Sequence, residues 1–260
     1  MAYTPYDWTQ NLQHRQEYIR DRLREGSPVV GLSYREGVLL LTMRRTQDKI
    51  FEIYDRLMFS GIGHQSDLEA LRLAAIDFAH REGFSRSAGD VTAQRVVGVA
   101  LSPVLKKGFG DFFSNPLVLR AIFAEMGATP QEDVFYLLDF DGEFTLHRGA
   151  AVAAGSEKSE EELLRFIEQD CAGNDADLSA ALKLALQAWA RGRYRGLLKE
   201  EAAGEELILG SQPLELLKQE LGEGVIEAAV LERNVSRENK FRHLRADEIR
   251  PVREELLSGK

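Results

Sequence analysis

Two glycine-containing turns are the first candidates for chemistry in this 260-residue chain. Gly61-Ile62-Gly63-His64 follows an apolar run and precedes a helical pattern, which is the order of a dinucleotide-binding turn. The third glycine of that fingerprint is absent, and the preceding strands are predicted to pair as hairpins. Asp139-Phe140-Asp141-Gly142 could attract calcium, but it lacks the glutamate that closes a calcium loop. We therefore interpret both segments as tight turns.

Composition excludes several other classes of site. The net charge of −9 argues against a nucleic-acid or anionic-membrane partner, so neither is predicted. Cys171 is the single cysteine and cannot form an internal disulfide, and the five histidines lack metal-ligand spacing. No metal and no cofactor are predicted. The N-terminus has no signal-peptide pattern and no apolar run reaches membrane-spanning length, so we expect a cytoplasmic protein.

The elements that must position any site begin with four short strands. Val29–Tyr34 and Val38–Thr42 flank a polar turn, and Ile50–Ile53 and Leu57–Ser60 flank another. No helix separates them, so they are predicted to pair in an antiparallel sheet. Further strands are predicted at 117–126, 133–140, 143–148, 225–231 and 240–244.

Helices are predicted in pairs between these groups of strands. Capping boxes at Ser66 and Ser159 and the cap residues Asp90 and Asp177 mark four helix starts. Gly83 and Gly192 are predicted to end two of them. Helices are also predicted at residues 9–25 and 246–257. Paired helices between runs of strands favour an α+β fold over a doubly wound sheet.

The order and spacing of several segments resemble a known family, the proteasome α-subunits. The segments are EYIR at 17–20, GSPVVGL at 26–32, EGVLL at 36–40, KIFEI at 49–53, LRLAAIDFA at 71–79 and DVTAQR at 90–95. They are more similar to the bacterial, actinobacterial-type α-subunits than to the archaeal or eukaryotic ones. The resemblance covers residues from about Tyr6 to Asp247 and is weakest over 193–222.

The resemblance implies a single α-type domain over residues 1–260 with the N-terminal nucleophile hydrolase fold, a four-layer αββα sandwich of two antiparallel sheets. It also implies a gate-like tail over residues 1–8. Residues 193–222 are interpreted as a surface insertion, because they lie between two segments that resemble the family well. The implied partners are copies of the same chain in a heptameric ring, a proteasome β-subunit, and the C-terminal tails of a ring-shaped AAA+ ATPase activator.

The resemblance also tests for catalysis. Proteasome β-subunits use an N-terminal threonine with an acid on the second strand and a lysine on the third. The matching positions here are Ser27, Met43 and Lys49. Ser27 follows a predicted helix and Met43 cannot act as an acid, so no catalytic residue is predicted. A hydrolase acting from Ser27, and a scaffold of the same fold without a proteolytic partner, remain as alternatives.

The predicted role is therefore a non-catalytic α-subunit that gates entry to the catalytic β-rings and docks the activator for protein degradation. By resemblance, Lys49 lies in the pocket that receives an activator's C-terminal carboxylate, and an ammonium group suits that ligand. Gly63 and His64 fall near the second wall of that pocket. The predicted gate consists of Tyr3, Thr4, Pro5, Tyr6, Asp7 and Trp8.

Overall fold

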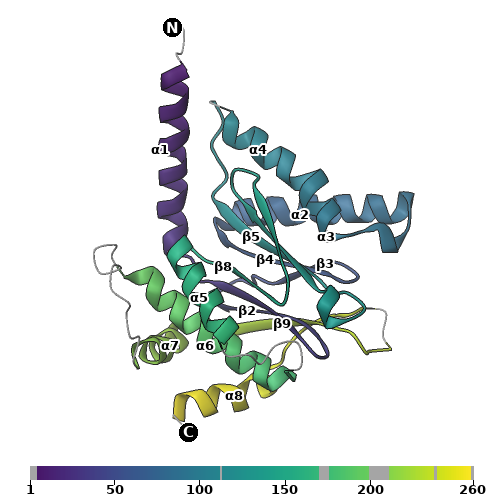
Figure 1. The fold of residues 1–260 in the computed structure, drawn as a ribbon, viewed down its shortest axis with the longest axis vertical. Coiled ribbons are helices and arrows are strands. Elements are labelled where there is room, and N and C mark those ends of the chain that lie inside the picture. Colours follow the sequence, from purple (N-terminus) through teal and green to yellow (C-terminus); the bar gives the residue numbers. More distant parts are fainter. Residues whose placement is uncertain (1–4, 112, 170–175, 199–210, 237–238, 259–260) are drawn as a thin grey trace.

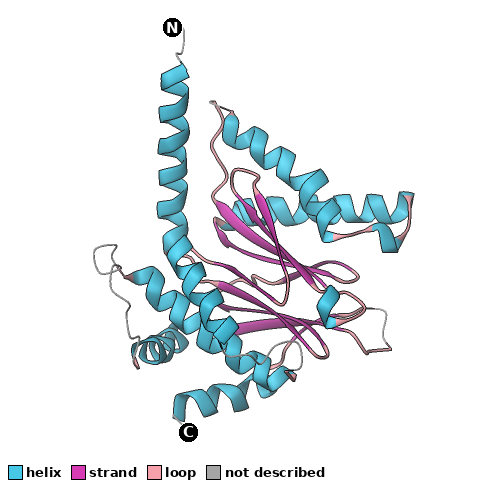
Figure 2. Cartoon of the chain, viewed as in Figure 1, coloured by secondary structure: helices cyan, strands magenta, loops and turns pink. Residues whose placement is uncertain are grey.

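Two five-stranded antiparallel sheets form the centre of the part of the chain that the structure describes (Figures 1 and 2). The structure is a computed structural model that describes residues 5–111, 113–169, 176–198, 211–236 and 239–258. In the first sheet the strand order is β10-β9-β2-β1-β8, and in the second it is β3-β4-β5-β6-β7. The predicted α+β sandwich with two facing sheets is confirmed.

The first sheet is centred on β1 and β2, which pair as the predicted hairpin with Leu32 opposite Leu39. Residues along β2 alternate between two cores: Leu39 and Leu41 face the helices, whereas Val38 and Leu40 face the second sheet. A continuous apolar run is thus the signature of a strand that is buried on both faces. The strands are β1 (Val29–Tyr34), β2 (Gly37–Arg44), β8 (Ala150–Ala153), β9 (Val225–Glu232) and β10 (Phe241–His243).

The second sheet begins with the other predicted hairpin. The expectation that the first four strands share one sheet is wrong, because β3 and β4 pair with each other and β4 then pairs with β5. The loop after β2 therefore crosses from one sheet to the other. At the β6–β7 turn, Gly142 has φ of +84°, as a hairpin turn requires. The strands are β3 (Phe51–Tyr54), β4 (Leu57–Gly63), β5 (Leu119–Glu125), β6 (Val134–Asp139) and β7 (Phe144–His147).

Helices cover the outer face of each sheet and complete the four layers (Figure 1). On the second sheet, the α3 and α4 segments are joined by a π-helical stretch at Val96–Leu101. The covering helices are α2 (Gln65–Ser85), α3 (Ala93–Arg95) and α4 (Ser102–Gly110) on the second sheet, and α5 (Glu157–Gln169), α6 (Leu178–Leu197), α7 (Gln212–Glu223) and α8 (Ala246–Ser258) on the first. Short 3₁₀ turns occur at Ala88–Asp90 and Pro130–Glu132.

Several predicted helix ends are wrong because the polar side chains make other bonds. Helix α2 starts after His64, and the Ser66 hydroxyl donates to Asp67 instead of closing a capping box. Ser159 lies inside α5 and donates to the carbonyl oxygen of Gly192 at 2.6 Å. Thr92, and not Asp90, accepts the capping hydrogen bond of α3. The Asp177 cap of α6 is confirmed, with Oδ1 accepting from Ala180 at 2.8 Å.

Two glycines expected at helix ends lie inside helices, where small size is what the packing requires. A Cβ on Gly192 would lie 2.2 Å from a methyl carbon of Leu163, because α5 and α6 approach closely there. Gly83 lies within α2, and a Cβ there would lie 2.3 Å from the Tyr54 hydroxyl oxygen. Close packing and helix termination both select glycine, so the sequence alone does not separate them.

Helix α1 (Pro5–Arg24) rises from the body, and its N-terminal half extends beyond the sheets (Figure 1). Among the α1 side chains that the structure describes, Ile19 and Leu23 are the buried ones, and they lie in the core between the two sheets. The helix begins at Pro5, where proline is well tolerated, so residues 5–8 of the predicted tail belong to α1. Among the described residues, no helix has the length and apolar character to cross a membrane.

A buried ion pair joins the two sheets. Asp133 is fully buried and accepts hydrogen bonds from Arg233, from the Ser33 hydroxyl and from the Gly127 amide. Arg233 Nη2 lies 2.8 Å from Asp133 Oδ2. Because Ser33 is in the first sheet and Asp133 follows the second sheet's β5, this cluster fastens one sheet to the other.

Candidate functional site

A cavity of about 530 Å³ surrounds Lys49, at the point where the chain crosses from the first sheet to the second. One wall comes from the start of β1 and the end of β2, and the other from the ends of α6 and α7. The lining residues are Glu25, Ser27, Met43, Arg44, Arg45, Lys49, Arg193, Leu197, Glu220 and Gly224. The ends of the predicted insertion at 193–222 thus form part of this cavity, while residues 199–210 lie outside the described residues.

The Lys49 ammonium is held by two long hydrogen bonds. Nζ lies 3.3 Å from the carbonyl oxygen of Ser27 and 3.4 Å from Thr42 Oγ1. Burial lowers the pKa of Lys49 to about 8. The nearby Glu227 carboxylate raises this pKa, and the Arg193 guanidinium lowers it further. An ammonium has three donors, so one remains for a ligand in the cavity. The group is suited to a carboxylate, which would also favour its charged form.

The hydroxyl groups beside Lys49 are engaged in the structure's own hydrogen bonds. Thr42 Oγ1 donates to the carbonyl oxygen of Pro28 at 2.7 Å, and Trp189 Nε1 donates to Ser27 Oγ at 3.2 Å. Ser27 is joined to the preceding residue by a peptide bond, so it has no free amine to act as a base. The thioether of Met43 occupies the position of an acid. The cavity therefore keeps the lysine of a catalytic arrangement, without a terminal amine at position 27 and without an acid at position 43.

Arg193 and Glu220 form a wall that the sequence did not indicate as functional. Arg193 Nε pairs with Glu220 Oε1 at 3.1 Å, and its Nη1 donates to the carbonyl oxygen of Glu25 at 2.9 Å. These contacts join α6, α7 and the end of α1 beside Lys49. No sequence signal distinguished these charged residues from the other charges on amphipathic helices.

Gly63 and His64 do not line the Lys49 cavity. Gly63 has φ of +132°, and a Cβ there would lie 2.1 Å from the carbonyl oxygen of Val118, so only glycine fits. The His64 ring is half-exposed, with Nδ1 3.7 Å from Asp67. Within one chain the structure thus separates Lys49 from the other two predicted pocket residues, and the roles of all three remain predictions.

Four of the six predicted gate residues, Pro5 to Trp8, lie at the N-terminal end of α1. Tyr3 and Thr4 lie outside the described residues. The backbone of Pro5, Tyr6 and Asp7 is helical, and the exposed Trp8 follows in the same turn of α1. No gating role is tested by this arrangement.

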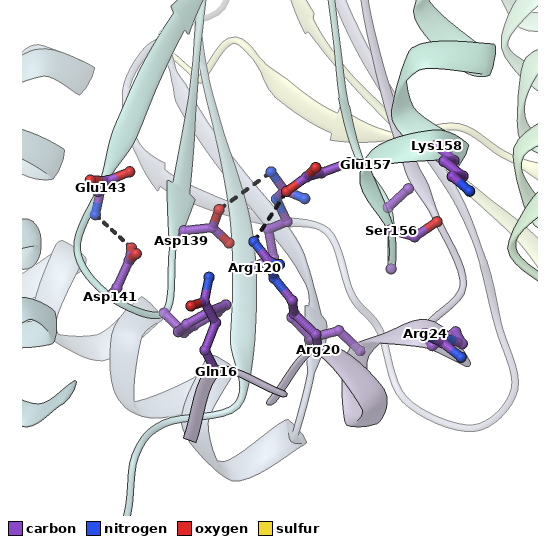
Figure 3. A pocket seen from close by; sticks show the side chains of 14 residues that line it. Gln16, Arg20, Arg24, Arg120, Asp139, Asp141, Glu143, Ser156, Glu157 and Lys158 are labelled. Atoms are coloured by element: carbon purple, nitrogen blue, oxygen red, sulfur yellow. Dashed lines mark hydrogen bonds and ion pairs between the residues drawn. The ribbon is translucent and has the colours of Figure 1, made fainter. Parts of the chain in front are cut away.

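A second cavity, of about 340 Å³, lies where α1 meets the body (Figure 3). Arg120 pairs with Asp139 at 3.3 Å and with Glu160 at 2.8 Å. Across it, Arg20 of α1 pairs with Glu157 at 3.1 Å. The residues that line it are Gln16, Arg20, Leu23, Arg24, Arg120, Asp139, Phe140, Asp141, Glu143, Ala154, Gly155, Ser156, Glu157 and Lys158.

Two carboxylates, Asp139 in the lining of this second cavity and Glu160 next to it, compete for the Arg120 guanidinium. Burial raises the pKa of Glu160 to about 7, although Arg120 and the hydrogen bond from the Ala154 amide lower it. Burial also raises the pKa of Asp139 above its usual range. The cluster, which lies where α1 meets the body, therefore takes up a proton as the pH falls through about 7. Within the described ranges, no group of three acidic, histidine or cysteine residues is arranged to hold a metal ion.

Comparison with known proteins matches residues 23–202 to the family model described as "Proteasome subunit". "Proteasome subunit alpha" of Actinosynnema mirum is 33% identical over 242 residues, which cover 91% of this chain and 81% of that protein. The proteins of the same name from Kineococcus radiotolerans and Thermomonospora curvata are 31% and 30% identical, with 96% of this chain covered in each case. They are covered over 95% and 94% of their own length.

Proposed function

The chain belongs to the proteasome-subunit family, and from that membership we propose that it is the non-catalytic α-type subunit of a bacterial proteasome core. It forms a heptameric outer ring with copies of itself and stacks on rings of a β-subunit. Its N-termini restrict the entry of substrates, and its outer surface docks a ring-shaped ATPase that feeds proteins to the β active sites. The compartment is the cytoplasm.

The Lys49 cavity is the observation that carries the docking part of this proposal. An amine that is partly desolvated, has a donor to spare and faces an open cavity is a suitable receptor for the terminal carboxylate of an activator tail. The guanidinium groups that line the cavity are already paired, Arg44 with Asp48, Arg45 with Glu223 and Arg193 with Glu220. Among the described lining residues, Lys49 is therefore the cation without a carboxylate partner of its own.

Gly63 and His64 complete the pocket from a neighbouring copy of the chain. This assignment agrees with their position outside the Lys49 cavity and with the half-exposed imidazole of His64. Ring assembly would bring the His64 face of one copy to the Lys49 cavity of the next. A pocket shared by two copies exists only in the ring, so binding of the activator tail would require that the ring has assembled.

Co-expression with the cognate β-subunit, followed by sizing and a peptidase assay, tests the proposal. The two chains should elute together as a particle of four stacked rings that hydrolyses a fluorogenic peptide, whereas this chain alone should be inactive. Hydrolysis by the isolated chain that disappears in Ser27→Ala would favour an independent hydrolase. Failure to bind any β-subunit, with ring formation intact, would favour a scaffold.

A further inference from the structure

Glu227 is a buried acid on β9 that binds the main chain of the β2–β3 crossing. Only 5% of the residue is exposed. Its Oε1 accepts from the amides of Lys49 and Ile50 at 3.0 and 2.9 Å, and its Oε2 also accepts from the Lys49 amide at 3.0 Å. A carboxylate that accepts several amide bonds is strongly held, because each bond is charge-assisted.

These bonds fix the direction of the Lys49 side chain. Ile50 is fully buried in the core between the sheets, so the chain must turn sharply after the exposed residues 45–48. Glu227 holds the two successive amides at that turn, and the Lys49 side chain then runs toward Ser27 and Thr42. Without this acceptor, two buried or half-buried amides would lose their partner, at a cost that favours a different path for the loop.

The charge of Glu227 also acts on the Lys49 ammonium. The charged groups facing the cavity are Glu25 at the end of α1, Arg44, Arg45 and Asp48 beside the crossing, Arg193 on α6 and Glu220 on α7. Two cations act on Glu227: Arg44 Nε lies 3.9 Å from its Oε2, and His243 of β10 lowers its pKa. Glu227 is the acid that raises the pKa of Lys49, against the effect of burial. Its carboxylate is occupied by amides, so it favours the ammonium without occupying the donors that a ligand would use.

We propose that Glu227 is the positioning residue of Lys49: it fixes the backbone that aims the amine into the cavity and keeps a negative charge close to it. This inference rests on the proposed docking function of Lys49. The substrate of the site is a carboxylate at the end of a polypeptide, and Glu227 does not touch it. Its effect is to orient the amine and to favour the charged form against the effect of burial.

Two measurements on particles assembled from the full chain and its β-subunit test the inference. The first is trace acetylation of lysines with acetic anhydride between pH 6.5 and 10, read by peptide mass spectrometry. Lys49 of the unaltered chain should react with a midpoint near pH 8, and Glu227→Gln should move that midpoint to lower pH. Glu232→Gln is the matched control, since this acid lies at the other end of β9 and pairs with Arg242 at 2.8 Å.

The second measurement is the affinity of a labelled octapeptide with the C-terminal sequence of the ring ATPase, made with a free carboxylate and with a terminal amide. Glu227→Gln should weaken binding of the free-carboxylate peptide about five-fold or more at pH 8 and within about two-fold at pH 6.5, where Lys49 is charged in both proteins. A general folding defect would weaken binding equally at both pH values.

The outcomes separate this inference from the proposed function. Equal affinities of the carboxylate and amide peptides for the unaltered particle would overturn the docking function, and the acetylation midpoint would still decide the role of Glu227. An unchanged midpoint in Glu227→Gln would overturn the charge part of the inference, and an unchanged affinity at both pH values would overturn the positioning part, even if Lys49 docks the tail.

Discussion

Lys49 Nζ lies 3.3 Å from the carbonyl oxygen of Ser27, whereas in a catalytic arrangement the lysine would serve a nucleophile with a free terminal amine. Lys49 occupies the position of the catalytic lysine, but its ammonium donates a hydrogen bond to the main-chain carbonyl of Ser27. Its remaining donor faces the cavity. In a catalytic subunit these elements present a hydroxyl group to a peptide bond. In this chain the same elements can present the Lys49 amine to a ligand.

Replacing Lys49 should weaken activator docking. A charge-assisted bond contributes about 1.5–3 kcal/mol, so Lys49→Ala should lower the affinity for the tail peptide by about ten- to a hundred-fold. Lys49→Glu should be worse, because it opposes two carboxylates in a poorly screened cavity. Lys107→Ala on exposed α4 is the matched control. Three equal affinities for Lys, Ala and Glu at position 49 would return Lys49 to the class of ordinary surface lysines.

Tail binding should decline as the pH rises through about 8, because the amine of Lys49 loses its proton there. The pKa of the folded state lies below the ordinary value of 10.5, so the unfolded chain binds a proton that the folded chain does not between these values. Stability from this group therefore rises with pH between about 8 and 10.5. A titration of peptide affinity from pH 6.5 to 9.5 checks the prediction, and a flat profile would contradict it.

Shortening the N-terminus should open the particle. Deleting residues 1–8 should speed hydrolysis of a small fluorogenic peptide by the assembled particle, since access and not chemistry would have been limiting. Because α1 begins at Pro5, deletion of 1–4 leaves the helix complete, and deletion of 1–8 removes its first turn. A comparison of the two assigns the barrier to one segment or the other. Equal rates for both truncations and the full chain would rule out a gate in this region.

Breaking the Asp133–Arg233 pair should destabilise the fold without touching the Lys49 cavity. Asp133→Asn leaves a buried guanidinium without its counter-charge, and the expected loss is about 3–5 kcal/mol of unfolding free energy. Urea denaturation measures it. The double variant Asp133→Asn with Arg233→Met should recover part of that loss, because neither charge is then left alone. A loss below about 1 kcal/mol in the single variant would show that the pair is dispensable.

The cluster under α1 should make stability pH-dependent in the acid range. The pKa of Glu160 is raised to about 7 in the folded state, from an ordinary value of 4.5, so its contribution is fully present below 4.5 and is lost as the pH rises through 7. The unaltered chain should therefore lose stability relative to Glu160→Gln between pH 5 and 7.5, by at most about 3 kcal/mol. Urea denaturation of both proteins at the two pH values measures this difference. A difference that stays constant would show that Glu160 remains charged throughout.

Local patterns predicted the elements that depend on local chemistry. The hairpin of β1 and β2, the Asp141-Gly142 turn and the Asp177 cap each follow from residues within a few positions, and all are confirmed. The resemblance to actinobacterial α-subunits is also confirmed. Because that resemblance fixes the order of many elements at once, it predicted the layered fold more firmly than any single motif did.

Features that depend on distant contacts could not be predicted in this way. Strand β8 is a run of alanine and valine that becomes a strand only because β1 pairs with it. The serines at 66 and 159 fit a capping box locally, but their neighbours in space offered other partners. Glu227 had one visible signal, a single acid within the apolar run of β9, yet its partners lie 177 and 178 positions away.

The crossing between the sheets has a mechanical consequence. Strand β3 has four residues and lies at the edge of its sheet. Under the proposed docking function, a pull on Lys49 by the ATPase would therefore load the hydrogen bonds of β3 one after another. The Lys49 and Ile50 amides, just before that strand, donate hydrogen bonds to Glu227 and so hold this backbone against the first sheet. Tension would therefore pass into β9 and β2, whose long pairing shares the load, and β3 would be spared.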